Sequence, residues 1–154
     1  MRDGVHLSTN VYLPKNCSTP VPAVLVRTPY GKEDGCEIYY RYVQRGYAVV
    51  VQDVRGRNAS EGEWLPNYHE VEDGDDTLNW IAAQHGAADA SVWWAVLPGL
   101  CTVGSAASGN PHLKALISVV CAGSAFVDLP AGGSFTSGML AWAFAVSQKT
   151  FHPD

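Results

Sequence analysis

Basic clusters, long apolar runs and closely spaced cysteines are all missing from this chain of 154 residues. The formal net charge is −5, and without a Lys/Arg cluster a nucleic-acid partner is not expected. No uninterrupted apolar run approaches the roughly 18 residues of a membrane-spanning helix, so no membrane partner is expected either. The start, MRDGVHL, lacks the basic and apolar regions of a secretion signal, which predicts a cytoplasmic protein.

Signatures of metal and cofactor sites are also absent. The 4 cysteines are widely and irregularly spaced without a C-x-x-C pair, which argues against a zinc site or a disulfide framework. Gly104 and Gly109 have the glycine spacing of a phosphate loop, but Asn110 and Pro111 stand where Lys and Ser/Thr are required. No G-x-G-x-x-G opens a helix. We therefore expect neither a metal nor a cofactor.

What the chain does have is the composition of a globular domain, with 47% hydrophobic and 16% charged residues. Residues 4–14 alternate apolar and polar side chains, which predicts a strand. Three further segments contain short continuous apolar runs that are typical of strands buried on both faces. These three segments are residues 22–31, 47–56 and 113–123.

Two segments between these strands have the pattern of helices. Residues 37–44 predict a short helix that ends near Gly46. Residues 67–86 predict a longer helix whose acidic first half suits the helix dipole better than a metal site, and on which Trp80 packs against the sheet. Alternating strands and helices predict an α/β fold, a mostly parallel sheet with helices on both faces.

Chemistry in such sheets gathers beyond the carboxyl ends of the strands. This rule selects TPYGK (28–32), QDVRGR (52–57) and the stretch before PHLKALI. Asp53, Arg55 and Arg57 are expected to shape their loop through ion pairs, and Glu61 and Glu63 to be solvated. The histidines show no spacing typical of metal ligands.

Several blocks in this order resemble the catalytic domain of X-Pro dipeptidyl-peptidases and cocaine-esterase-like hydrolases. The blocks are MRDGVHLSTNVYLP, VPAVLVRTPYGK, RGYAVVVQDVRGRNASEGEW, EVEDGDDTLNWIAAQ, ASGNPHLKALISVV and GGSFTSGMLAWAFA. The resemblance implies a partial α/β-hydrolase fold and acyl transfer through Ser, His and Asp on a small ester or X-Pro peptide substrate. It also implies that residues 1–154 are the N-terminal part of the catalytic domain, truncated before the cap and the acid and histidine.

Tyr30 is the candidate catalytic residue that the resemblance assigns. In this family the tyrosine of the PY pair donates a hydrogen bond to the oxyanion, together with the backbone N–H after the nucleophile. From the residues alone, Pro-Tyr-Gly is good turn chemistry, so an ordinary turn tyrosine is the alternative. Asp53 does not qualify as the triad acid, because α/β-hydrolases place the acid and the base after the nucleophile.

The nucleophile itself is missing from the sequence. No serine has glycine two residues before and two after it; Ser60 comes nearest but lies in the wrong loop, and Val103 replaces the second glycine around Cys101. The unusual segment 93–106 suggests a compensated local frameshift, with divergence into a pseudoenzyme as the alternative. Asp128 and His152 are only nominal candidates for acid and base. Exposed sheet edges predict self-association.

Overall fold

The computed structural model describes residues 1–15, 20–33, 37–66, 68–84, 87–96, 107–119 and 137–150. In these residues five strands form one sheet in the order β1-β3-β2-β4-β5. Only β1 is antiparallel to its neighbour; every other pair is parallel, as the α/β prediction requires. The strands are β1 (Thr9–Tyr12), β2 (Val21–Thr28), β3 (Ala48–Asp53), β4 (Ala87–Val96) and β5 (Leu113–Val119).

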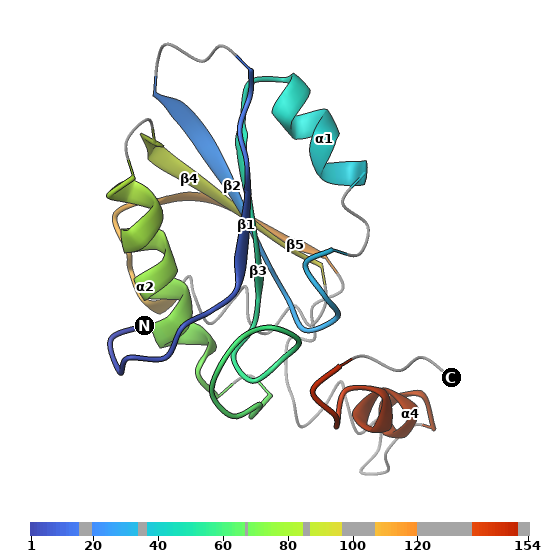
Figure 1. Ribbon diagram of the computed structural model, residues 1–154. Coiled ribbons are helices and arrows are strands. Elements are labelled where there is room, and N and C mark those ends of the chain that lie inside the picture. Colours follow the sequence, from blue (N-terminus) through green and yellow to red (C-terminus); the bar gives the residue numbers. More distant parts are fainter. Residues whose placement is uncertain are drawn as a thin grey trace.

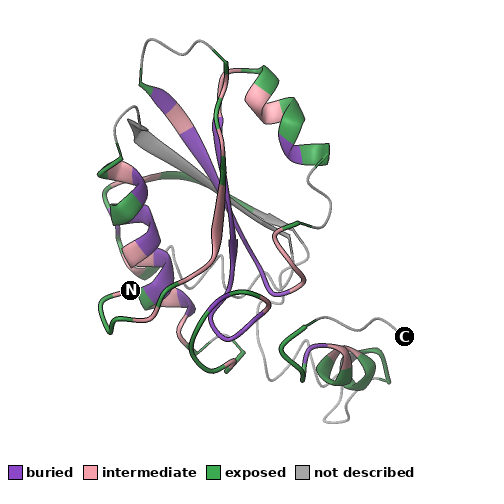
Figure 2. Cartoon of the chain, viewed as in Figure 1, coloured by how far each residue is buried: buried purple, intermediate pink, exposed green. Residues whose placement is uncertain are grey.

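Helices cover both faces of this sheet. Helix α1 (Glu37–Gln44) lies against one face and α2 (Glu70–Ala82) against the other (Figure 1). A further helix, α4 (Ser137–Ala145), lies beside the loop that follows β3, and most of its surface is exposed (Figure 2). Within the described residues, no helix has both the length and the apolar character needed to cross a membrane.

The core has two halves because β2 and β3 bury alternate side chains on opposite faces. Leu25 and Val50 belong to the half that packs against Leu78 and Ile81 of α2. Val24, Val26, Val49 and Val51 belong to the half that packs against Tyr39 of α1. Burying one such aliphatic side chain stabilises the fold by about 1.5–3 kcal/mol. The prediction that these two strands are buried on both faces is confirmed.

The first helix begins and ends where its sequence predicts. Gly46 follows α1 with φ +90°, a conformation that glycine adopts without steric cost, and its N–H donates to the Val43 carbonyl at 3.0 Å. The chain then turns directly into β3. Local chemistry therefore determines this boundary.

Two predictions about packing are wrong. Trp80 is 44% exposed rather than packed on the sheet, because the buried face of α2 centres on Thr77 and Ile81, about a quarter turn away. Residues 113–123 were predicted to be a strand buried on both faces, yet Ile117 of β5 is 47% exposed. The reason is that β5 is the last strand of the sheet within the described residues.

Asn110 fixes the turn that leads into β5. Its amide nitrogen donates to Asp75 Oδ1 at 2.7 Å and to Asn79 Oδ1 at 3.0 Å, both on α2. Its oxygen accepts the His112 N–H at 2.9 Å, and the side chain is almost entirely buried. The turn is therefore attached to the helix that precedes β4.

Candidate functional site

The candidate site lies at the carboxyl ends of β2 and β3. These two strands are parallel neighbours, and Thr28 at the end of β2 pairs with Asp53 at the end of β3. The loops after them therefore emerge at one edge of the sheet, as the sequence predicts. They carry Tyr30 on one side and Arg57 on the other.

Tyr30 is half-buried in the turn after β2. Its backbone N–H donates to Thr28 Oγ1 at 3.1 Å, which fixes the start of the turn. Its phenol oxygen accepts a hydrogen bond from the indole Nε1 of Trp142 in α4 at 2.9 Å. This bond uses a lone pair of the oxygen and not the phenolic hydrogen. The arrangement suits a phenol that donates to an oxyanion, and that role stays a prediction.

A pocket of about 270 Å³ opens next to Tyr30. Its charged wall is built on Asp53, whose Oδ1 accepts the Lys32 N–H at 2.8 Å and the Asn58 amide at 3.3 Å. The Lys32 ammonium lies 3.7 Å from Asp53 Oδ2. Asp53 therefore supports the loop that carries Tyr30, as expected for a structural residue. The lining residues are Tyr30, Gly31, Lys32, Glu33, Asp53, Asn58, Ala59 and Thr150.

A buried charge cluster lies below this edge, between β2 and the first turn of α2. Arg27 donates to Gln52 Oε1 at 2.9 Å and forms an ion pair with Glu70. Arg55 donates to both oxygens of Asp73, at 2.9 and 2.6 Å, and is ion-paired as predicted. Burial raises the pKa of Glu70, an effect that the nearby Arg27 opposes.

The acidic run stands at the start of α2, as the sequence predicts. Two of its members, Glu70 and Asp73, are buried beneath arginines, which the sequence pattern does not indicate. The physical reason is that Arg27, near the end of β2, and Arg55, in the loop after β3, both reach the first turn of the helix. Arg27 is not among the residues that the sequence predicts for the site; its position one residue before the end of a buried strand is the available signal.

Arg57 also departs from its prediction. Its side chain is fully buried, but its hydrogen bonds go to two carbonyl groups, those of Pro29 and Val146, each at 2.9 Å. In the described part of the chain it makes no ion pair. It lies over the Trp64 ring, 5.7 Å from the ring centre. Burial lowers the pKa of Arg57.

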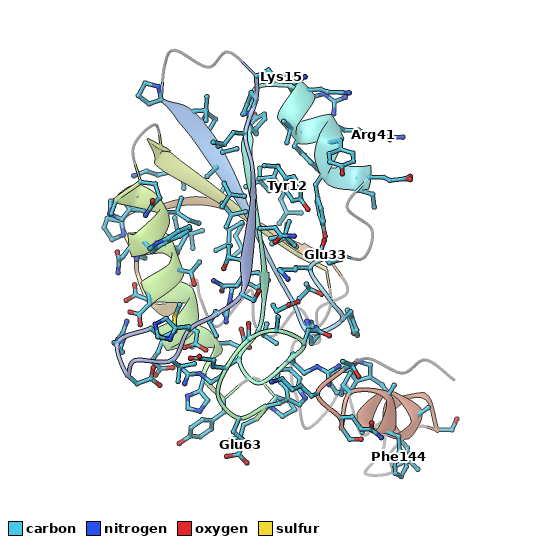
Figure 3. All side chains as sticks on the ribbon, in the orientation of Figure 1. Tyr12, Lys15, Glu33, Arg41, Glu63 and Phe144 are labelled. Carbon is cyan, nitrogen blue, oxygen red and sulfur yellow. The ribbon has the colours of Figure 1, made fainter. Side chains whose placement is uncertain are left out.

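Ser60 has a structural role in the loop after β3. Its side chain is fully buried, its Oγ donates to the Asp53 carbonyl at 2.7 Å, and it accepts the Ser8 N–H at 2.9 Å. These contacts agree with its exclusion as the nucleophile. Glu61 and Glu63 are exposed as predicted; Glu61 accepts the His6 N–H, and Glu63 points away from the loop (Figure 3).

Several predicted features fall outside the described residues. Of the segment 93–106, the structure describes only the backbone of 93–96, where Trp93 pairs with Leu25 and Trp94 with Ile117. Both tryptophans therefore stand in β4. The remaining features outside the description are residues 97–106, all four cysteines, Asp128 and His152.

The fold defines the class of protein. An α-amino acid ester hydrolase superposes on 98% of this chain with a TM-score of 0.80 and 23% identity, and 29% of its own chain is covered. The α/β hydrolase GrgF from Penicillium sp. sh18 superposes on 73% of this chain with a TM-score of 0.65 and 20% identity, and 41% of its own chain is covered. The chain has the α/β-hydrolase fold in part.

Within that class, the family follows from the sequence. The model of the X-Pro dipeptidyl-peptidase (S15) family matches residues 3–153, and the chain belongs to this family. Cocaine esterase from Rhodococcus sp. (strain MB1 Bresler) is 46% identical over an alignment of 90 residues, and the match covers 54% of this chain. The match spans 16% of the length of that esterase.

Proposed function

We propose that residues 1–154 supply the N-terminal part of the catalytic domain of a serine hydrolase that cleaves small esters or X-Pro peptide bonds. Family membership supports the reaction class. The observation that carries the proposal is the Tyr30 phenol at the carboxyl end of β2, with its oxygen held by Trp142. There the phenol would donate to the oxyanion of an acyl-transfer intermediate, a contribution of about 3 kcal/mol.

The chain as printed lacks the serine for that reaction, so we propose that it forms no acyl intermediate. No serine stands in a G-x-S-x-G motif. The hydroxyl of the nearest match, Ser60, donates its hydrogen bond to the Asp53 carbonyl. A compensated frameshift across codons 93–106 accounts for the missing motif. The alternative explanation of the missing motif is divergence into a non-catalytic fragment or pseudoenzyme that retains only the fold.

Two assays test this proposal. A fluorophosphonate probe and a p-nitrophenyl ester are expected to give neither labelling nor turnover with this chain. Covalent labelling of any side chain between Trp93 and Ser108 would overturn the claim of inactivity. Reading the gene in its other frames across codons 93–106 then separates the two explanations, because only a frameshift leaves an encoded Gly-x-Ser-x-Gly.

The role of Tyr30 can be tested only in a protein of this family that carries the nucleophilic serine. In such a protein, Tyr30→Phe is expected to lower kcat about 10²–10³-fold with little change in KM, because an oxyanion donor acts mainly in the transition state. Tyr12→Phe, a change of the same chemistry on β1, is the control and should leave kcat unchanged. An unchanged kcat in the Tyr30 variant would identify it as an ordinary turn tyrosine.

A further inference from the structure

Arg57 is a fully buried cation that makes no ion pair in the part of the chain described by the structure. Burying a guanidinium is costly, and proteins normally offset the cost with a carboxylate partner. Arg55, two residues earlier, follows that rule through its bidentate contact with Asp73. Arg57 instead donates to the carbonyls of Pro29 and Val146. These two hydrogen bonds join segments that are far apart in the sequence, one around Pro29 and one around Val146.

The two carbonyls belong to segments that meet again at the phenol of Tyr30. Pro29 directly precedes Tyr30, and Val146 follows the end of α4, where its N–H donates to the Trp142 carbonyl at 3.0 Å. Trp142 in turn donates to the Tyr30 phenol at 2.9 Å. The hydrogen bonds therefore form a closed circuit from Arg57 through Pro29, Tyr30, Trp142 and Val146 back to Arg57.

A closed circuit of this kind determines where the phenol oxygen lies. A turn tyrosine held only by its own backbone is free to change rotamer, whereas this one is held at both the turn and the hydroxyl. An oxyanion donor is effective only when it is already in place, since a misplacement of about 1 Å can cost on the order of 10²-fold in rate. Donation from Trp142 into the phenol oxygen also strengthens the phenol as a donor, because linked hydrogen bonds polarise one another.

We infer that Arg57 is a positioning residue for Tyr30: it joins Pro29 to the C-terminal end of α4, so that Trp142 holds the phenol in place. The effect of this positioning on catalysis rests on the proposed function, in which Tyr30 donates to the oxyanion. The positioning itself is a property of this chain and can be measured without turnover. Arg57 does not touch the reacting atoms and is not a catalytic residue.

The test follows the indole N–H signals of the 5 tryptophans by ¹⁵N–¹H NMR. Trp142→Phe assigns the Trp142 signal, and Tyr30→Phe shows its position when the hydrogen bond is lost. Arg57→Leu is expected to move the Trp142 signal toward that position and to speed its hydrogen exchange by about tenfold. Arg41→Leu, which removes an exposed arginine from α1 (Figure 3), should leave the signal in place.

Two results would overturn the inference. One is an Arg57→Leu chain whose Trp142 signal is unchanged; the other is an equal shift of all the indole signals, which would indicate a general loosening. If Arg57→Leu does not fold, Arg57→Lys is measured instead, and it must give a shift between wild type and Tyr30→Phe. A shifted Trp142 signal in this chain, combined with an unchanged kcat of Tyr30→Phe in the protein that carries the nucleophile, would refute the proposed role of Tyr30 and leave the positioning intact.

Discussion

Asp73 is the residue on which the buried charges at the start of α2 depend. It receives two hydrogen bonds from Arg55, and its Oδ2 lies 3.7 Å from Nη2 of Arg27. Removing one partner of a buried ion pair leaves the other charge uncompensated. Asp73→Ala is therefore expected to lower the free energy of unfolding by about 3–5 kcal/mol, measured by urea denaturation. Glu72→Ala, an exposed neighbour on the same helix, should change it by less than about 0.5 kcal/mol.

Gly56 offers a second test at the scale of one residue. Its φ is +71°, and a Cβ there would lie 2.2 Å from the backbone nitrogen of Trp64. Gly46 also has a positive φ but has nothing within 4 Å of a Cβ. Gly46→Ala should cost about 1 kcal/mol from the backbone conformation alone, and Gly56→Ala clearly more. Equal losses in thermal or urea unfolding would show that the contact with Trp64 relaxes freely.

Which individual residues would gather at the site was predictable, but not how they would be paired. Tyr30 and Arg57 follow buried strands and Asp53 ends one, and the ends of parallel strands meet at one edge. The bond between Trp142 and Tyr30 joins residues 112 positions apart and leaves no periodic trace in the sequence. The partners of Arg57 are also distant in the sequence. Its charge suggested an ion pair, whereas in the folded chain it donates to the carbonyls of Pro29 and Val146.

At the scale of elements, the burial of α2 shows which of its apolar side chains face the sheet. Leu78 is fully buried against the sheet, whereas Trp80 is 44% exposed. Leu78→Ala is expected to cost about 2–5 kcal/mol in free energy of unfolding. Trp80→Ala should cost less than about 1 kcal/mol despite removing the larger side chain. A greater loss from Trp80→Ala than from Leu78→Ala in urea denaturation would contradict the observed helix face.

The elements themselves were predicted unevenly, and the difference is physical. Helix α1 has a local terminator in Gly46, and β2 and β3 have unbroken apolar runs, so each could be recognised from its own residues. The beginning of β4 at Ala87 carries small and polar residues that do not indicate a strand. The exposure of β5 depends on its place in the sheet order, which no local pattern encodes.

At the scale of the whole molecule, acid should weaken the fold through carboxylates held by their partners. The hydrogen bond from Arg55 lowers the pKa of Asp3 to about 2, from an ordinary 3.8. A carboxyl with a lowered folded pKa adds stability above its ordinary pKa, and this stability is lost as the pH falls toward the folded value. The stability difference between wild type and Asp3→Asn should therefore shrink from about pH 5 to about pH 2. A difference that stays constant across this range would contradict the bridge.

We also propose that this chain self-associates through the edge of β5. Among the residues that the structure describes, β5 is the last strand of the sheet and its Ile117 is 47% exposed. An unpaired strand edge is a template for pairing with another chain. Sedimentation velocity should show a concentration-dependent increase in mass. Ile117→Lys should suppress this increase, whereas Val11→Lys at the β1 edge should not. A wild-type chain that stays monomeric at every concentration would refute the proposal.

The attachment of Asn110 to α2 has a consequence for the gene as well as for the protein. The entry of β5 into the sheet is held by α2, a helix that is complete before codon 93 and so lies outside the proposed frameshift across codons 93–106. An insertion and a compensating deletion inside that interval could erase the chemistry and leave the architecture on either side intact. Such a lesion would be invisible to any screen that selects only for folding.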